Sequence, residues 1–368
     1  MSRLAGGYGY RLVSPNQLLE RYNFPSLDPA ADEVVVEVAG CGVCHTDISF
    51  AYQGVPTRHP LPLVLGHEIS GRVVAAGEVA AATEWQGRSV IVPAVIPCGA
   101  CPACQAGRPT ICRAQFMPGN DGDGGFATHV RVPFRGLCPV PESLPSGIEL
   151  ATLSVVADAV TTPYEAIRRS GLSSDDVAVF IGVGGIGGFG VQIAAALGAA
   201  VVAIDVDVER LDLLAKHGAS LTLDPRSVPE KELKTAVRSF VKQSGRKGIG
   251  LKIFETSGTP QGQATAFALL DHGAYLAVVG YTPQKLEVRL SNLMAFDATA
   301  RGNWGCPPEQ YPAALKLVLD GKVALAPFVE SHPLDDAPAV FEAVAKHAIR
   351  RRVILTPVPK LRDVGEAR

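Results

Sequence analysis

The chain has 368 residues and a formal net charge of −2, with 47% hydrophobic and 19% charged residues. This length exceeds what one hydrophobic core usually serves, so we expect two domains. The composition is that of a globular protein and excludes extended disorder. The charge supplies no overall field that would attract nucleic acid or a lipid surface, so we expect neither as a partner.

The first twenty residues lack the apolar centre of a secretory signal, and no apolar stretch reaches the roughly 20 residues that a membrane span requires. We therefore expect a cytoplasmic protein. In that reducing setting, eight cysteines indicate metal or thiol chemistry instead of disulfides.

Residues up to about 155 predict a domain made of β-strands. Runs rich in β-branched residues, with glycine turns between them, occupy residues 34–38, 70–75 and 89–92.

From about Thr161 onward, strands and helices alternate. Expected strands occupy residues 177–181, 201–204, 221–223, 251–254 and 275–279, and expected helices occupy 209–217, 232–242 and 263–270. This alternation predicts a doubly wound parallel sheet of the α/β class. Two further helices, at 308–319 and 340–346, precede a last strand at 352–355, which we expect to return to the first domain.

Four cysteines form the run C-x2-C-x2-C-x7-C, at Cys98, Cys101, Cys104 and Cys112. Four soft thiolates at such short spacing suit one tetrahedral Zn²⁺ that holds the loop in shape. Disulfide pairing is the alternative, and it would require an oxidising compartment.

A glycine-rich turn, G-x-G-x-x-G, lies between an expected strand and an expected helix. Gly182 permits the tight turn, Gly184 lets a pyrophosphate approach the backbone, and Gly187 lets the helix pack closely. Asp205 ends the next strand, where it would accept hydrogen bonds from ribose hydroxyls and repel a 2′-phosphate. We expect NAD rather than NADP. The alternative is a plain glycine turn beside a surface aspartate.

Two short segments upstream of the cysteine loop carry further ligand types, Cys44-His45-Thr46-Asp47 and Gly66-His67-Glu68. Cys44 and His67 suit zinc, but a catalytic zinc needs a third protein ligand and one open position. Taken one at a time, these residues have plain alternatives. The cysteine is then a buried thiol, the histidine a core residue, and the acidic residue a surface carboxylate.

In this order, G-x-C-H-T-D, G-H-E, the four-cysteine loop and the glycine turn resemble the zinc-dependent medium-chain alcohol dehydrogenases. The resemblance implies a GroES-like β domain over residues 1–159 and 304–368, with a structural zinc loop at 98–112. It also implies a Rossmann domain over 160–303, two Zn²⁺ per chain, NAD, and a homodimer or homotetramer.

The same resemblance implies roles for single residues. Cys44 and His67 match the ligands of the catalytic zinc, and Glu68 a nearby carboxylate that ligates occasionally. Thr46 matches the hydroxyl that takes the substrate proton, and Asp47 the partner that orients His67. The cofactor contacts expected besides the glycine turn and Asp205 are His45, Thr162 and Arg210.

The chain departs from the family's pattern at two positions. Many members place a cysteine where this chain has Asp158, whose oxygen can also ligate zinc. Many members carry a relay histidine where this chain has Ser49. The proton would then leave through ribose hydroxyls and water, or through His59.

Three stretches, residues 20–25, 118–121 and 157–163, are similar to one subgroup, the 6-hydroxycyclohex-1-ene-1-carbonyl-CoA dehydrogenases of anaerobic benzoyl-CoA degradation. That similarity implies oxidation of an alicyclic hydroxyacyl-CoA to the 6-oxo compound. Arg58, Arg113 and Arg301 are candidate contacts to the coenzyme A phosphates, or ordinary surface charges. The alternatives are a generic secondary-alcohol or polyol dehydrogenase, and a non-catalytic NAD-binding zinc protein.

Overall fold

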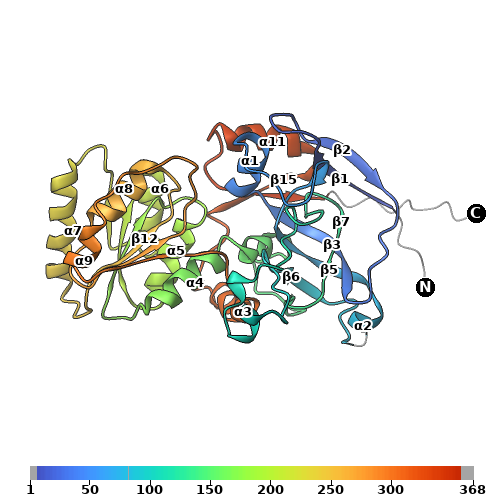
Figure 1. Cartoon of the computed structure of the whole chain (residues 1–368), viewed down its shortest axis with the longest axis horizontal. Coiled ribbons are helices and arrows are strands. Elements are labelled where there is room, and N and C mark those ends of the chain that lie inside the picture. Colours follow the sequence, from blue (N-terminus) through green and yellow to red (C-terminus); the bar gives the residue numbers. More distant parts are fainter. Residues whose placement is uncertain (1–5, 82, 358–368) are drawn as a thin grey trace, which may run out of the picture. The chain divides into compact units, whose positions relative to one another are not determined.

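The computed structural model of the chain describes residues 6–81 and 83–357. The chain folds into two compact units. Unit 1 is formed by Met1–Ile96, Gln115–Ala157 and Val329–Arg368, and unit 2 by Pro97–Ala114 and Asp158–Phe328. Figure 1 shows unit 1 as a body of strands and unit 2 as a sheet flanked by helices.

Unit 1 contains a seven-stranded sheet in the order β15-β16-β3-β5-β6-β8, with β7 also paired to β3. A three-stranded sheet, β2-β1-β4, accompanies it. The strands are β1 (Gly7–Leu12), β2 (Glu20–Phe24), β3 (Glu33–Gly42), β4 (Leu63–Val64), β5 (Glu68–Ala76), β6 (Ser89–Val92), β7 (His129–Pro133), β8 (Cys138–Pro139), β15 (Val329–Pro333) and β16 (Arg352–Thr356).

The core of unit 1 is centred on β3, whose Val34, Val36 and Val38 are buried. Strand β16 pairs antiparallel with β3, which brings the end of the chain back to its first part. The helices of this unit are short: α1 (His45–Tyr52), α2 (Glu78–Ala81), η2 (Ala151–Ala157), η4 (Leu334–Asp336) and α11 (Ala337–Ala345).

Unit 2 contains a six-stranded parallel sheet in the order β11-β10-β9-β12-β13-β14. Its strands are β9 (Val177–Ile181), β10 (Ala200–Ile204), β11 (Leu221–Leu223), β12 (Lys252–Glu255), β13 (Tyr275–Val278) and β14 (Thr299–Gly302). The first strand, β9, lies inside the sheet and is buried throughout. The strand order reverses beside β9, as in Rossmann domains, so the predicted fold class is confirmed.

Helices precede, connect and follow the parallel strands of unit 2 (Figure 1). They are α4 (Thr161–Ser170), α5 (Gly187–Ala196), α6 (Val208–Ala215), α7 (Glu230–Ser244), α8 (Pro260–Ala268), α9 (Ser291–Ala295), η3 (Pro308–Gln310) and α10 (Tyr311–Leu319). The cysteine loop contributes α3 (Pro102–Gln105) and η1 (Pro109–Ile111).

The division into units differs from the expected domain bounds in three places. Residues 304–328 group with unit 2, because α10 contacts α4. The cysteine loop, residues 97–114, also groups with unit 2 instead of the β domain. The expected bound at residue 159 lies two residues beyond Ala157, where unit 1 ends in this part of the chain.

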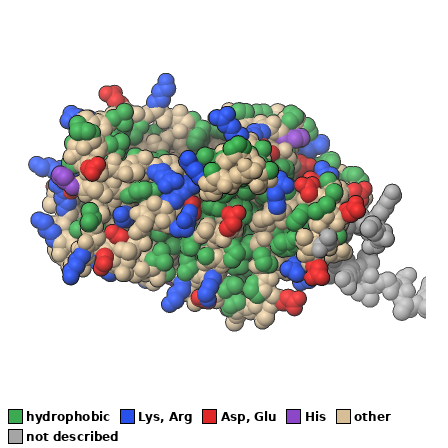
Figure 2. Space-filling view, turned by 60° about the horizontal axis from the view of Figure 1, so that its bottom comes forward, with side chains coloured by type: hydrophobic (Ala, Val, Ile, Leu, Met, Phe, Trp, Pro, Cys, Tyr) green, Lys and Arg blue, Asp and Glu red, His purple; other side chains and the backbone are tan. Residues whose placement is uncertain are grey.

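Charges of both signs are mixed on the face that Figure 2 shows, where Lys and Arg side chains lie among Asp and Glu side chains. None of the helices in the described part of the chain has the length and apolar character that crossing a bilayer requires.

Candidate catalytic site and metal centres

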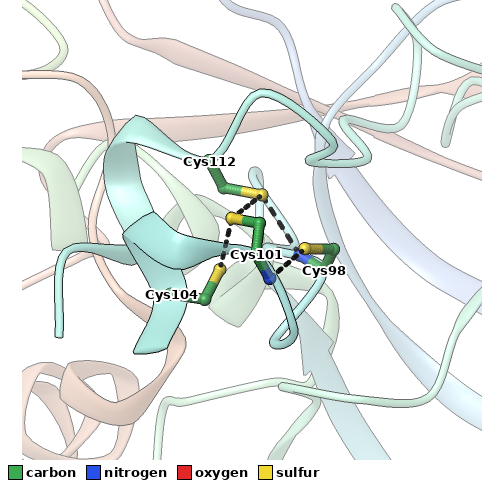
Figure 3. A group of neighbouring side chains, drawn as sticks. All are labelled: Cys98, Cys101, Cys104 and Cys112. Carbon is green, nitrogen blue, oxygen red and sulfur yellow. Dashed lines mark hydrogen bonds between the residues drawn. The ribbon is translucent and has the colours of Figure 1, made fainter. Parts of the chain in front are cut away.

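The four predicted loop cysteines come together around one point. Their sulfur atoms all lie within 4.8 Å of one another, and Figure 3 shows them facing each other across the turn of the loop. All four are free thiols. This arrangement has the donor set and the compactness of a tetrahedral zinc site.

Backbone N–H groups stabilise the thiolate form of this cluster. Cys101 N donates to Cys98 Sγ at 3.3 Å, and Cys98 N donates to Cys112 Sγ at 3.4 Å. Hydrogen bonds from the backbone of Ala100 and Cys101 lower the pKa of Cys98 to about 6. Burial and the neighbouring Cys101 raise the pKa of Cys104 to about 12. A divalent cation bound among the four sulfur atoms would displace the remaining thiol protons, because a thiol must be deprotonated to bind a metal.

Arg169 links the cysteine loop to other parts of unit 2. Arg169, in α4, donates to Thr110 Oγ1 at 2.8 Å and to Asn303 Oδ1 at 3.3 Å. Its Nε lies 2.6 Å from the buried carboxylate of Glu165. These contacts explain why the loop groups with the parallel-sheet unit.

A second group of ligand types consists of Cys44, His67, Glu68 and Asp158, whose donor atoms lie within 4.8 Å of one another. Cys44 is the N-cap of α1, and His67 directly precedes β5. Asp158 follows Ala157, the last residue of η2. Gly66 shapes the approach to His67, because its φ is 99° and a Cβ would meet Cys41 Sγ at 2.8 Å.

The carboxylate of Asp47 contacts residues of this second group. It is buried and accepts from Cys44 N at 2.9 Å and from Gly66 N at 3.1 Å. Its Oδ1 also lies 3.3 Å from His67 Nδ1. When Nδ1 carries the proton for that contact, the lone pair of Nε2 is left for a metal, as in many metal-binding histidines.

Glu68 is engaged by an arginine from the other end of the chain. Arg352 Nε donates to Glu68 Oε2 at 3.1 Å, and Arg352 Nη2 donates to Glu68 Oε1. Both side chains are buried. This bidentate pair holds a carboxylate that the sequence places beside the metal, and no sequence pattern pointed to Arg352.

Helix α1 carries the residues expected around the reacting atoms. Cys44 Sγ donates to Thr46 Oγ1 at 3.6 Å, so the hydroxyl lies beside a ligand. The imidazole of His45 is exposed and stacks on His347 with ring centroids 5.5 Å apart. Ser49 Oγ lies 2.9 Å from both His45 O and Gln53 Oε1, so its one hydroxyl hydrogen is used within the helix.

The three glycines of the turn differ in how closely other atoms approach them. A Cβ at Gly182 would meet Ser257 Cα at 2.3 Å, and one at Gly187 would meet Gly182 O at 2.1 Å. At Gly184 the nearest atom would be Arg210 Nη1 at 3.6 Å. The first and third glycines are therefore required by packing, whereas Gly184 leaves an open approach to the backbone.

Asp205 stands beside this turn at the end of β10. Its Oδ2 accepts from Val183 N at 2.7 Å, and its Oδ1 accepts from Asp207 N at 2.9 Å. Arg210 Nη1 lies 3.7 Å from Asp205 Oδ2. The two residues thus bring one negative and one positive charge to the turn.

Thr162 has polar contacts that the sequence did not suggest. Its hydroxyl donates to Asp158 Oδ1 at 2.5 Å, and its carbonyl accepts from Asn303 Nδ2 at 3.2 Å. The spacing of four residues between Asp158 and Thr162 places them one helical turn apart, a signal that is visible in the sequence once Asp158 is recognised as a ligand candidate.

Two family models match the chain. The alcohol dehydrogenase GroES-like domain matches residues 30–142, and the zinc-binding dehydrogenase family matches residues 185–320. Among curated proteins, an alcohol dehydrogenase of Rhizobium meliloti is 30% identical, covering 90% of this chain and 93% of its own length.

Two solved structures have a fold similar to that of this chain. Galactitol-1-phosphate dehydrogenase from Escherichia coli has a TM-score of 0.84 and 25% identity, covering 95% of this chain and 100% of its own. Acetophenone reductase from Geotrichum candidum, solved in complex with NAD, has a TM-score of 0.81 and 25% identity, covering 96% of this chain and 98% of its own.

Proposed function

The chain belongs to the family of zinc-dependent medium-chain alcohol dehydrogenases, and on this premise we propose that it oxidises a secondary alcohol to a ketone with NAD. The observation that carries the proposal is the compact group of Cys44, His67, Glu68 and Asp158. Thiolate, imidazole and carboxylate are the donors of catalytic zinc sites, where three protein ligands leave one position open.

We assign the three ligand positions to Cys44, His67 and Asp158. Glu68 is not assigned as a ligand, because Arg352 binds both of its oxygens. Asp47 orients His67 and braces the backbone of Cys44 and Gly66 at the same time. An outer carboxylate of this kind fixes the ring and raises the basicity of the ligating nitrogen.

Zinc held by these residues supplies Lewis acidity toward an alcohol oxygen, and NAD held at the glycine turn supplies the hydride acceptor. The hydroxyl of Thr46, beside Cys44, accepts the proton that the alcohol loses. Ser49 does not continue the relay, because its hydroxyl hydrogen is used inside α1. When bound, NAD would supply ribose hydroxyls near this site through which the proton would pass to water.

NAD is supported by the open backbone at Gly184 and by the carboxylate of Asp205 beside the turn. The carboxylate would accept hydrogen bonds from ribose hydroxyls and repel a 2′-phosphate. The related acetophenone reductase was solved with NAD. His45 and Arg210 are proposed as further contacts to the dinucleotide.

For the substrate, we propose 6-hydroxycyclohex-1-ene-1-carbonyl-CoA. The support is the similarity of residues 20–25, 118–121 and 157–163 to the enzymes that oxidise it. Arg113 and Arg301 are exposed and could meet coenzyme A phosphates, whereas Arg58 is already paired with Asp121 at 3.2 Å. The second candidate is a simple secondary alcohol or polyol, which the relation to galactitol-1-phosphate dehydrogenase favours.

A non-catalytic NAD-binding zinc protein is the candidate from another class. It would carry zinc in the cysteine loop and have no need for a second set of ligands. The convergence of three suitable donors at the second group argues against it.

Metal analysis coupled to NADH absorbance tests the proposal. We expect two zinc ions per chain in the wild type, one for each ligand group. Cys44→Ser should lose one zinc and the NAD-dependent activity. Cys138→Ser, a change of a buried thiol in the same unit outside both groups, should keep both. A wild type with a single zinc and no hydride transfer would refute the proposal.

Saturation kinetics decide the substrate. The proposal expects a higher kcat/KM with the alicyclic hydroxyacyl-CoA than with ethanol, simple secondary alcohols or polyols. Equal or better turnover of the simple alcohols would assign the chain to the second candidate function. Formation of NADH with any of these substrates would retain the reaction class.

A further inference from the structure

We propose that Thr162 is a positioning residue that fixes the carboxylate of Asp158, so that a single oxygen of that carboxylate faces the zinc. Thr162 Oγ1 donates to Asp158 Oδ1 at 2.5 Å, and Thr162 N donates to Asp158 O at 2.8 Å. Asp158 and Thr162 are 9% and 5% exposed. The inference rests on the proposed function, because it assumes zinc at the second ligand group.

A carboxylate ligand poses a positional problem that a thiolate does not. Cysteine offers one sulfur, whereas aspartate offers two equivalent oxygens, and its terminal torsion angle is broad. An unrestrained Asp158 could bind zinc through either oxygen or through both, with a different coordination number in each case. A hydrogen bond to Oδ1 restricts this freedom, because it fixes the terminal torsion angle and uses one lone pair of Oδ1, which favours Oδ2 as the ligand.

The hydroxyl of Thr162 is available for this role. A threonine hydroxyl carries one hydrogen, and the short contact shows that it is directed at Asp158. The carbonyl of Thr162 accepts from Asn303 Nδ2, and its N–H serves the backbone of Asp158. We therefore assign Thr162 the role of positioning the metal ligand Asp158, although the sequence suggested that Thr162 contacts the cofactor.

The size of the effect follows from outer partners of metal ligands in general. Loss of such a partner typically lowers metal affinity by 10- to 100-fold, because the ligand loses its orientation. A hydrogen bond that only stabilised the start of α4 would change the stability of the fold and leave the affinity for zinc unaltered.

The test measures zinc affinity of the full chain by competition with a chelator. The zinc of the four-cysteine loop serves as the internal reference. We expect Thr162→Val, which keeps the shape and removes the hydroxyl, to weaken the second zinc about 10- to 100-fold. Thr162→Ser, which keeps the hydroxyl, should stay near the wild type.

Thr265→Val is the matched control. Thr265 is also buried in a helix, and its hydroxyl donates to Gln261 O at 2.9 Å, far from both ligand groups in the sequence. It should leave both zinc affinities unchanged. If Thr162→Val fails to fold, the comparison of Thr162→Ser with Thr162→Ala answers the same question.

A double-mutant cycle separates positioning from general stability. In an Asp158→Cys background the ligand has one donor atom, so adding Thr162→Val should cost no further zinc affinity. With Co²⁺ in the second site, Thr162→Val should weaken the visible absorption bands, because a second carboxylate oxygen raises the coordination number.

Unchanged zinc affinity in Thr162→Val, or an equal loss in the Asp158→Cys background, would overturn the inference. A wild type that holds zinc in the cysteine loop alone would overturn both this inference and the proposed function. The two failures are distinguishable, since the first leaves two zinc ions in the wild type.

Discussion

Arg352 and Glu68 form a buried charge pair at the edge of the candidate catalytic site. Removing one member leaves the other charge buried without compensation, which costs about 3–5 kcal/mol of unfolding free energy. We expect Arg352→Met to lower the stability of unit 1 by about this amount in urea titrations. Arg351→Met, a change of the exposed neighbour, should have little effect.

The double variant Glu68→Gln with Arg352→Met removes both charges of this pair together. It should recover most of the lost stability, because no unpaired charge is left in the interior. If the double variant is as unstable as Arg352→Met, the shape of the arginine matters more than its charge.

Asp205 and Arg210 bring opposite charges close to the glycine turn, where we propose that the cofactor binds. Asp205→Ser removes the charge that repels a 2′-phosphate and takes away one of the two carboxylates near Arg210, whose Nη2 also lies 3.9 Å from Asp207 Oδ2. We expect the ratio of kcat/KM for NADP over NAD to rise by about 10- to 100-fold, since like charges at close range cost several kcal/mol. Asp207→Ser is the control, because it removes a neighbouring charge and can still cap α6. An unchanged ratio would remove Asp205 as the selector.

Ligand types were predictable from the sequence, but several of their partners were not. Short spacing brought out the four loop cysteines, and the glycine pattern pointed to Asp205. Arg352 lies 284 residues from Glu68, and a contact over such a separation leaves no periodic signal. Thr162 was expected from the sequence as a cofactor contact, and its hydrogen bond to Asp158 could not be foreseen because it depends on the side-chain rotamers.

At the level of elements, strands bounded by turns were predicted best. The expected bounds of β6, β9 and β11 agree with the structure, because apolar runs end there at polar residues or glycine. Helix bounds shifted by a few residues, as for α8, where Thr259 caps the helix and Pro260 begins it earlier than the apolar pattern suggested. The grouping of residues 304–328 depends on packing between α10 and α4, which periodicity cannot show.

The cysteine loop is an element whose shape should depend on its metal. Cys104→Ser removes one of four ligands, and we expect the loop zinc to be lost and the loop to open. Limited trypsin digestion should then cut after the exposed Arg113 faster than in the wild type. The same fragments should be missing when Arg113→Gln is added. Equal cleavage rates with and without the loop zinc would show that packing alone holds the loop.

The whole molecule joins two kinds of architecture, and the chain passes between them more than once. Unit 1 closes only when β16 returns to β3, so its sheet depends on residues from both ends of the chain. Unit 2 is built mainly from neighbouring strands and helices of one continuous segment. This difference explains why the parallel sheet was easier to predict than the sheet of unit 1, since non-local pairings leave weaker patterns in a sequence.

Glu255 should shape how the stability of the folded chain depends on pH. Its carboxylate is buried at the end of β12, and burial raises its pKa above the ordinary value of 4.5, although Ser257 and Gly258 donate hydrogen bonds to Oε1. Above pH 4.5 the unfolded chain loses this proton while the folded chain still holds it. The unfolding free energy therefore falls as pH rises through the raised pKa, by at most about 1.4 kcal/mol per pH unit.

Glu255→Gln keeps the accepting oxygen and removes the titration, so it should abolish this part of the slope. The measurement is urea unfolding across the pH range from 4.5 upward, in a Trp85→Phe background. Trp304, in the same unit as Glu255, is then the sole tryptophan and reports on unit 2. We expect the unfolding free energy of the protein with Glu255 to fall, relative to that of the Glu255→Gln variant, as pH rises. Parallel curves for the two proteins would mean that Glu255 ionises in the folded chain as readily as in the unfolded one.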